Sequence, residues 1–112
     1  MQDELVVIWT SGDRDVAIRM VFMYSTNSML RGWWEKITLM VWGASSKLLT
    51  EDKELQDHIK RMQELGVNVI ACKSCSDSYG ITEALQALGI DVKYTGQILT
   101  DYIKNGNKVI TF

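Results

Sequence analysis

The sequence is poor in residues on which several common sites depend: it has no proline, two cysteines and one histidine in 112 residues. Two cysteines cannot form a disulfide scaffold, and we expect both to be reduced thiols in the cytoplasm. The histidine, His58, falls on the polar side of a predicted helix, where we expect it to be solvated. It supports neither a serine triad nor a four-ligand zinc site. The missing proline argues against a thioredoxin fold, which relies on a cis-proline beside its redox cysteines.

Charge and hydropathy exclude two further classes of partner. The formal net charge is -2, which gives no general attraction to nucleic acid or to an anionic membrane. No apolar run approaches the ~20 residues that cross a bilayer. The first residues, MQDELVV, lack the basic and apolar regions of a signal peptide. With 46% apolar and 23% charged residues, we expect one folded domain over residues 1–112.

What the sequence does contain is an alternation of β-rich and helical segments. Apolar runs predict strands at 5–10, 37–43, 67–72, 91–94 and 108–112. Helical periodicity and glycine stops predict helices at 15–31, 51–65, 81–88 and 97–104. Short connections of this kind require parallel strands and right-handed crossovers. The predicted fold class is therefore α/β: a three-layer α/β/α sandwich with a five-stranded parallel sheet, flavodoxin-like in outline.

The connections carry their own predictions. Residues 44–50 and 73–80 are predicted as loops, with Thr50 as the cap of the second helix. Ser11 or Asp13 can cap the first helix.

The first predicted helix is apolar around most of its circumference, with a narrow polar edge near Asp15, Arg19 and Thr26. A domain of this size has little interior in which to bury such a helix on all sides. We therefore expect another subunit to cover part of it, in preference to a wide core face filled by methionine. The tryptophans are expected in the core and in subunit contacts, because no basic groove accompanies them.

Both cysteines lie in the segment VNVIACKSCSDSYG, residues 67–80. Cys72 ends a predicted strand, and in open α/β sheets the functional crevice lies at the carboxyl ends of the strands. Only a thiolate is nucleophilic, and a neighbouring cation or a helix N-terminus raises its fraction. Lys73 supplies a cation, and Ser74 and Ser76 are types that begin a helical turn. The alternative is a buried cysteine that acts as a small hydrophobic residue.

Two other loops follow strands at the same predicted edge. Ser11 and Gly12 follow the first strand, while Gly43 and Ala44 follow the second. With the cysteine loop they could form one rim. Neither the Walker pattern nor the dinucleotide fingerprint is present, so a plain strand-to-helix turn explains Gly12 equally well.

The sequence resembles the DsrE/DsrF-like family, small α/β proteins of bacterial and archaeal sulfur metabolism. The resemblance runs from VVIWTSGD through Gly43 and GVNVIACKSCSDSYGI to GIDV and KVITF. Its most specific piece is a cysteine that ends the third strand with a glycine eight positions later, here Cys72 and Gly80. The resemblance implies trimers or hexamers and a persulfide on Cys72. Some members have a second cysteine at the position of Cys75.

Three functions remain open at this point. The first is a sulfur carrier or sulfurtransferase-like protein that exchanges sulfur with a donor or acceptor protein, using Cys72 with Cys75 as a resolving thiol. In it Lys73 favours the thiolate, while Ser74, Ser76 and loop N–H groups hold the terminal sulfur. The second is a non-enzymatic oligomeric module that binds a small anion or nucleotide at the rim. The third is a thiol–disulfide switch. The exposure of Cys72 separates the first from the second, and no cofactor or metal is expected.

Overall fold

Strands and helices alternate along the chain, as the apolar runs predict. The computed structural model describes residues 3–112, so Met1 and Gln2, which entered the signal-peptide prediction, lie outside the described residues. The strands are β1 (Glu4–Trp9), β2 (Lys36–Val41), β3 (Asn68–Cys72), β4 (Asp91–Lys93) and β5 (Lys108–Thr111). The helices are α1 (Arg14–Val16), the π-helix η1 (Ala17–Phe22), α2 (Met23–Arg31), α3 (Ala44–Glu51), α4 (Lys53–Glu64), α5 (Lys73–Tyr79), α6 (Thr82–Ala87) and α7 (Thr95–Lys104). Within this described range, none of the helices has the length and hydropathy that a bilayer crossing requires.

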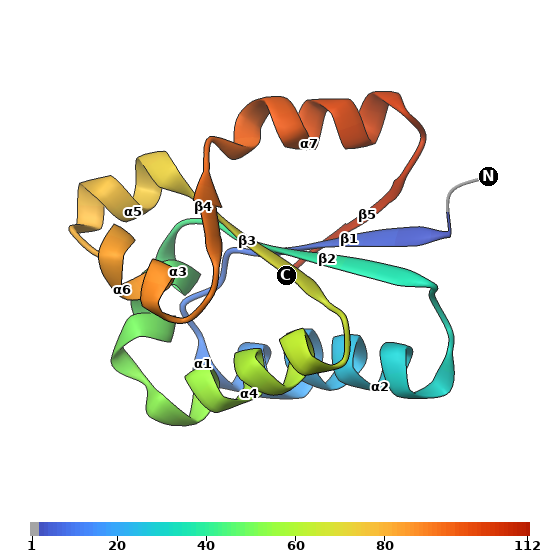
Figure 1. Ribbon diagram of the computed structural model, residues 1–112, viewed down its shortest axis with the longest axis horizontal. Coiled ribbons are helices and arrows are strands. Elements are labelled where there is room, and N and C mark those ends of the chain that lie inside the picture. The colour runs from blue at the N-terminus through green and yellow to red at the C-terminus, as the bar shows by residue number, and fades with distance from the viewer. Residues whose placement is uncertain (1–2) are drawn as a thin grey trace.

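Across residues 3–112, five strands form one parallel sheet in the order β4-β3-β2-β1-β5. From β1 to β4 each connection moves to the next strand in the same direction. Right-handed crossovers then place the connecting helices on one face of the sheet. The last connection must return past β3, β2 and β1 to reach β5, so α7 lies on the opposite face (Figure 1). The predicted three-layer α/β sandwich is confirmed.

The two faces of the sheet have unequal cores. On one face, Leu5, Val7 and Trp9 of β1 pack in a large cluster with residues of η1, α3, α4 and α6. On the other face, Val6 and Ile8 join a small cluster that is covered by residues of α7. Alternate residues of a strand point to opposite faces. A strand that is buried along its whole length, as β1 is, therefore reads as one continuous apolar run.

The predicted first helix divides into α1, η1 and α2, and its apolar residues divide with it. Ala17, Val21 and Phe22 are buried in the core. Met20, Met23, Tyr24 and Leu30 remain exposed, with Met23 at 51%. Of the apolar residues that surround this helical stretch, some therefore pack in the core and others lie on the surface.

The tryptophans also include both buried and exposed side chains. Trp9 is fully buried in the main core, whereas Trp33 is 53% exposed. The predicted place in the core is thereby confirmed for Trp9, and the exposed ring of Trp33 continues the apolar surface of α2.

Two predicted loops are wrong, because both segments are helical. Residues 44–50 belong to α3, and residues 73–79 form α5, which begins directly after β3. The second helix is also capped differently: the Asp52 carboxylate accepts from the backbone N–H groups of Glu54 and Leu55. The Thr50 hydroxyl instead donates to the Lys47 carbonyl inside α3. The prediction for Asp13 is confirmed, since its side chain caps α1.

Candidate functional site

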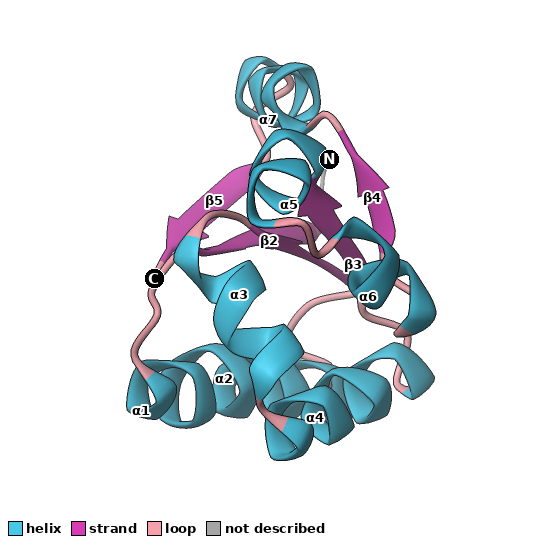
Figure 2. Ribbon diagram, turned by 90° about the vertical axis from the view of Figure 1, so that its left-hand side faces the viewer, coloured by secondary structure: helices cyan, strands magenta, loops and turns pink. Residues whose placement is uncertain are grey.

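Three helices begin at the carboxyl edge of the sheet, around the end of β3. Helix α3 follows β2, α5 follows β3 and α7 follows β4. Figure 2 looks onto this edge, with α5 in front of the sheet, α7 above it and α3 below it. The residues that precede α3 and α7, Gly43 and Tyr94, make no side-chain cap. At the start of α5, Cys72 offers a sulfur where a capping serine or aspartate would offer an oxygen. The site therefore combines a thiol with helix N-termini, which favour negative charge.

Cys72 is buried, with 5% of the residue exposed, and it precedes α5 without a side-chain cap hydrogen bond. The groups that lower the pKa of its thiol are the backbone N–H groups of Cys75 and Ser74, the Thr95 hydroxyl and the Cys75 thiol. Burial raises the pKa of Cys72, but the hydrogen bonds outweigh burial, so that its pKa lies below the ordinary thiol value of 9.0. Cys72 is thus held in a form that ionises readily, as a nucleophilic thiol requires.

Cys75 has the opposite character. Burial raises its pKa, as do its hydrogen bond to Cys72 and the charge there, while the Gly43 N–H lowers it only in part. Cys75 therefore keeps its proton when Cys72 has lost its own. It is half-buried and lines an open hollow of about 330 Å³ with Ser74, Ser78 and Tyr79. Of the two sulfurs, Cys75 is the one nearer to solvent.

Lys73 does not serve the role expected from its place beside Cys72. Its ammonium group bonds to the Asp77 carboxylate at 2.6 Å, one helical turn along α5, and lies 5.7 Å from the centre of the Tyr94 ring. The groups that lower the pKa of Cys72 are the donors described above. A residue next to a helix cap points along its own helix toward position i+4, which explains this pairing.

The two serines of the predicted site have different surroundings. Ser74 is exposed and contributes its backbone N–H to the Cys72 sulfur. Ser76 is buried, where its hydroxyl donates to the Lys73 carbonyl at 3.1 Å and lies 2.7 Å from the Thr82 hydroxyl. Ser76 thus joins α5 to α6 and is occupied away from the sulfur.

The predicted rim residues do come together. A Cβ atom on Gly12 would lie 3.4 Å from the Ala44 Cβ, so the loop after β1 touches the start of α3. The next link is Gly43, with φ at +84°, whose N–H donates to the Cys75 sulfur. Ser11 lies farther out and accepts from the Asp13 N–H through its hydroxyl at 3.0 Å. The loop after β1 and the starts of α3 and α5 therefore form one continuous rim.

Thr95 belongs to the site although the sequence prediction omitted it. It is the first residue of α7 and follows β4, which pairs with β3 so that Cys72 lies beside Lys93. The carboxyl ends of all parallel strands meet at one edge, so the loop after the fourth strand was also a candidate. The position of Thr95 directly after the fourth strand could therefore have been predicted from the sequence.

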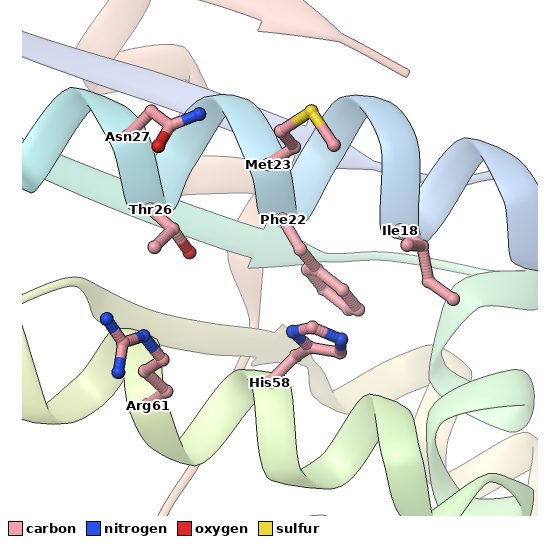
Figure 3. Close-up of a pocket in the computed structure, with 7 residues that line it drawn as sticks. All are labelled: Ile18, Phe22, Met23, Thr26, Asn27, His58 and Arg61. Atoms are coloured by element: carbon pink, nitrogen blue, oxygen red, sulfur yellow. The ribbon is translucent and has the colours of Figure 1, made fainter.

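The continuous helical stretch from α1 through η1 to α2, residues 14–31, is called here the first helical segment. A second hollow, of about 250 Å³, lies between this segment and α4, away from the cysteines (Figure 3). His58 forms one side and stacks on the Phe22 ring, with ring centres 5.4 Å apart. The prediction of a freely solvated histidine is therefore wrong, because the ring is half-buried against an aromatic neighbour. Nor does His58 join a metal site: within residues 3–112, no three metal-binding side chains come together.

The fold and the cysteine site together define a small parallel α/β protein with a buried free cysteine at the end of its third strand. The DsrE/DsrF-like family matches residues 5–112, and the chain belongs to this family. Among curated proteins, none matches the chain.

Solved structures share this fold. The chain is similar to the conserved protein of unknown function BT1422 from Bacteroides thetaiotaomicron, with 39% identity, a TM-score of 0.96, and 98% of this chain and 95% of that chain covered. It is also similar to the protein of unknown function MTH1491 from Methanobacterium thermoautotrophicum, with 18% identity, a TM-score of 0.79 and coverage of 97% and 98%. The ychN protein from E. coli has 16% identity, a TM-score of 0.72 and complete coverage of both chains.

Proposed function

We propose that this protein is a sulfur carrier in which Cys72 accepts a sulfur atom as a persulfide. The observation that carries the proposal is the place of Cys72, which ends β3 at the carboxyl edge of the sheet and directly precedes α5. Groups at the starts of α5 and α7 lower the pKa of its thiol, and such groups stabilise an anionic sulfur more than a neutral thiol. The family's role in sulfur metabolism supports the same reading.

The loading step needs no external oxidant. The Cys72 thiolate attacks a sulfane sulfur of a polysulfide, and the sulfur–sulfur bond behind that atom breaks. The bond electrons leave on the shortened polysulfide, while Cys72 retains one extra sulfur with a negative charge. The reverse attack, by an acceptor thiolate on that outer sulfur, returns the Cys72 thiolate.

The low exposure of Cys72 limits which donors can reach it. A small inorganic polysulfide needs little room, whereas a partner protein must approach through the hollow at Cys75 or displace the rim. We therefore propose that loading uses a small donor, and that exchange with a donor or acceptor protein passes the more open Cys75 side.

Intact-mass spectrometry after brief polysulfide treatment tests the carrier role. The native chain and Cys75→Ser are expected to gain the mass of one sulfur, and Cys72→Ser is not. Reduction with a dithiol should remove the added mass. The carrier role is lost if all three proteins stay unmodified, or if Cys72→Ser gains sulfur as readily as the native chain.

A small-anion module is the second candidate, and the burial of Cys72 favours it. In that case the sulfur is part of the wall, while the free N–H groups at the starts of α3 and α7 hold the anion. Isothermal titration with sulfite and with thiosulfate distinguishes this function. Binding that is equal in the native chain and in Cys72→Ser would favour the module over the carrier.

A thiol–disulfide switch is the third candidate, because the Cys75 thiol already donates to the Cys72 sulfur. Oxidation by a peroxide would join the two sulfurs, with loss of two protons and transfer of two electrons to the peroxide. Residues three apart on a helix have Cβ atoms ~5–6 Å apart, whereas a disulfide needs ~3.5–4.5 Å. The first turn of α5 must therefore tighten for the bond to form, and mass loss of two hydrogen atoms after peroxide treatment would reveal it.

A further inference from the structure

Thr95 presents a buried hydroxyl that has no hydrogen-bond partner among the described residues. The residue is 1% exposed, and its Oγ1 atom finds no partner within residues 3–112. A buried hydroxyl without a partner is destabilising. The hydroxyl lies near enough to Cys72 to lower the pKa of the thiol. It is therefore free to donate to an anionic sulfur held at Cys72.

The position of Thr95 follows from the topology of the sheet. Strand β4 pairs with β3, and the chain then turns at Tyr94 to begin α7 on the opposite face. Figure 1 shows the starts of α5 and α7 close to the end of β3, at the same side of the molecule. The backbone N–H groups of Cys75 and Ser74 on α5 and the Thr95 hydroxyl on α7 all lower the pKa of Cys72. Groups on two separate elements therefore act on one sulfur atom.

The backbone N–H groups and the Thr95 hydroxyl differ in whether they can reorient when the negative charge shifts from one sulfur atom to another. In the free thiolate, the negative charge lies on Cys72 Sγ. In a persulfide, Sγ is bonded to a second sulfur and the charge moves to that outer atom. Backbone N–H groups are fixed by the helix, but a threonine hydroxyl rotates about its C–O bond. Thr95 is thus suited to donate to either sulfur.

We propose that Thr95 is a positioning residue whose hydroxyl binds the anionic sulfur on Cys72, first Sγ in the thiolate and then the outer sulfur in the persulfide. The contact with the outer sulfur rests on the proposed carrier function, whereas the contact with Sγ concerns the protein before any sulfur is loaded. By holding the outer sulfur, Thr95 slows its loss to solvent and orients it toward an incoming acceptor. The substrate class that this geometry selects is a small anionic sulfur chain.

The first test measures the ionisation of Cys72 without any sulfur donor. Ultraviolet thiolate absorbance is followed against pH in the Cys75→Ser background, where Cys72 is the single cysteine. Thr95→Val removes the hydroxyl at nearly constant volume and is expected to move the titration to higher pH. Thr95→Ser restores the hydroxyl and should return the titration toward its starting point. Thr100→Val is the matched control, because the Thr100 hydroxyl donates to the Gly96 carbonyl on the same helix, away from the sulfur.

The second test measures the lifetime of the persulfide after polysulfide treatment and removal of the donor. Thr95→Val is expected to lose the added sulfur about tenfold faster than the native chain or more, as the loss of one hydrogen bond to a charged group would cause. Thr95→Ser and Thr100→Val should keep the native lifetime. Circular dichroism checks each fold, and Thr95→Ala replaces Thr95→Val if the latter loses helix.

The outcomes separate this inference from the carrier function. If Thr95→Val titrates like its parent and keeps the native persulfide lifetime, Thr95 has no positioning role, and the carrier function stands. A shifted titration with an unchanged lifetime overturns the contact with the outer sulfur. If the native chain forms no persulfide at all, the carrier function fails, and the titration still decides whether Thr95 binds the thiolate.

Discussion

The pKa of Cys72 is lowered by groups at the starts of α5 and α7, and the adjacent Lys73 is not among them. Burial opposes ionisation of its thiol, and the donors from α5 and α7 favour it. The sequence predicted that Lys73 favours the Cys72 thiolate, but Lys73 is not among the groups that lower the pKa of Cys72. Lys73 and Cys72 are neighbours in sequence, yet the lysine side chain bonds to Asp77. Side-chain direction at a helix start cannot be read from adjacency alone.

Replacement of Lys73 tests this assignment. In Lys73→Gln the titration of Cys72 should stay close to that of the native chain, because the lysine is paired with Asp77. The pair is exposed, so we expect the urea midpoint of unfolding to change little. Asp77→Asn is the matched control in the same pair. A shift of the Cys72 titration as large as that of Thr95→Val would instead make Lys73 the activating group.

Helix N-termini explain both the successes and the errors in the predicted elements. Asp13 and Asp52 cap α1 and α4, and capping residues of this type mark a helix start in the sequence. Helices α3, α5 and α7 begin at Gly43, Cys72 and Tyr94, which give no such signal. Two of these three helices were accordingly predicted as loops or partial turns. These three helix starts lie around the end of β3 and have no side-chain caps.

The capping role of Asp52 is directly measurable. Asp52→Ala removes the acceptor for the Glu54 and Leu55 N–H groups, as well as an ion pair with Arg14. We expect the free energy of unfolding to fall by about 1 kcal/mol in urea denaturation. Thr50→Ala is the control, because Thr50 was the cap predicted from sequence and should cost less. An equal loss in both variants would contradict the assigned cap.

The order of the strands in the sheet determines which connecting segments lie side by side. The amino-acid composition does not reveal this order. Apolar runs predicted the strands themselves well: β1 covers Glu4–Trp9 where the sequence indicated residues 5–10. Parallel pairing and the α/β class followed from short connections. The reversal between β4 and β5 did not, and it is this reversal that sends α7 over the second face of the sheet. His58 was misplaced for a similar reason, since its partner Phe22 lies on a different helix.

We propose that a second copy of the chain covers the outer side of the first helical segment. Large apolar side chains remain exposed there, namely Met20, Met23, Tyr24 and Leu30, with Trp33 just beyond. The double variant Met20→Glu with Met23→Glu should reduce the mass of the assembly in analytical ultracentrifugation. Ile103→Glu on α7 is the control, because Ile103 is exposed but lies on the other face. A native chain that is already monomeric would refute the proposed contact.

The central claim is that the folded protein favours the Cys72 thiolate, and its most direct test is the thiolate titration of folded Cys75→Ser. A pKa lowered by folding implies that thiolate formation stabilises the fold. This contribution is complete above the unfolded pKa near 9.0 and is lost as the pH falls through the folded pKa. We therefore predict a thiolate signal that appears below pH 9.0 in the folded protein and moves upward in urea. The same midpoint in both states, or a higher one in the folded protein, would contradict the account.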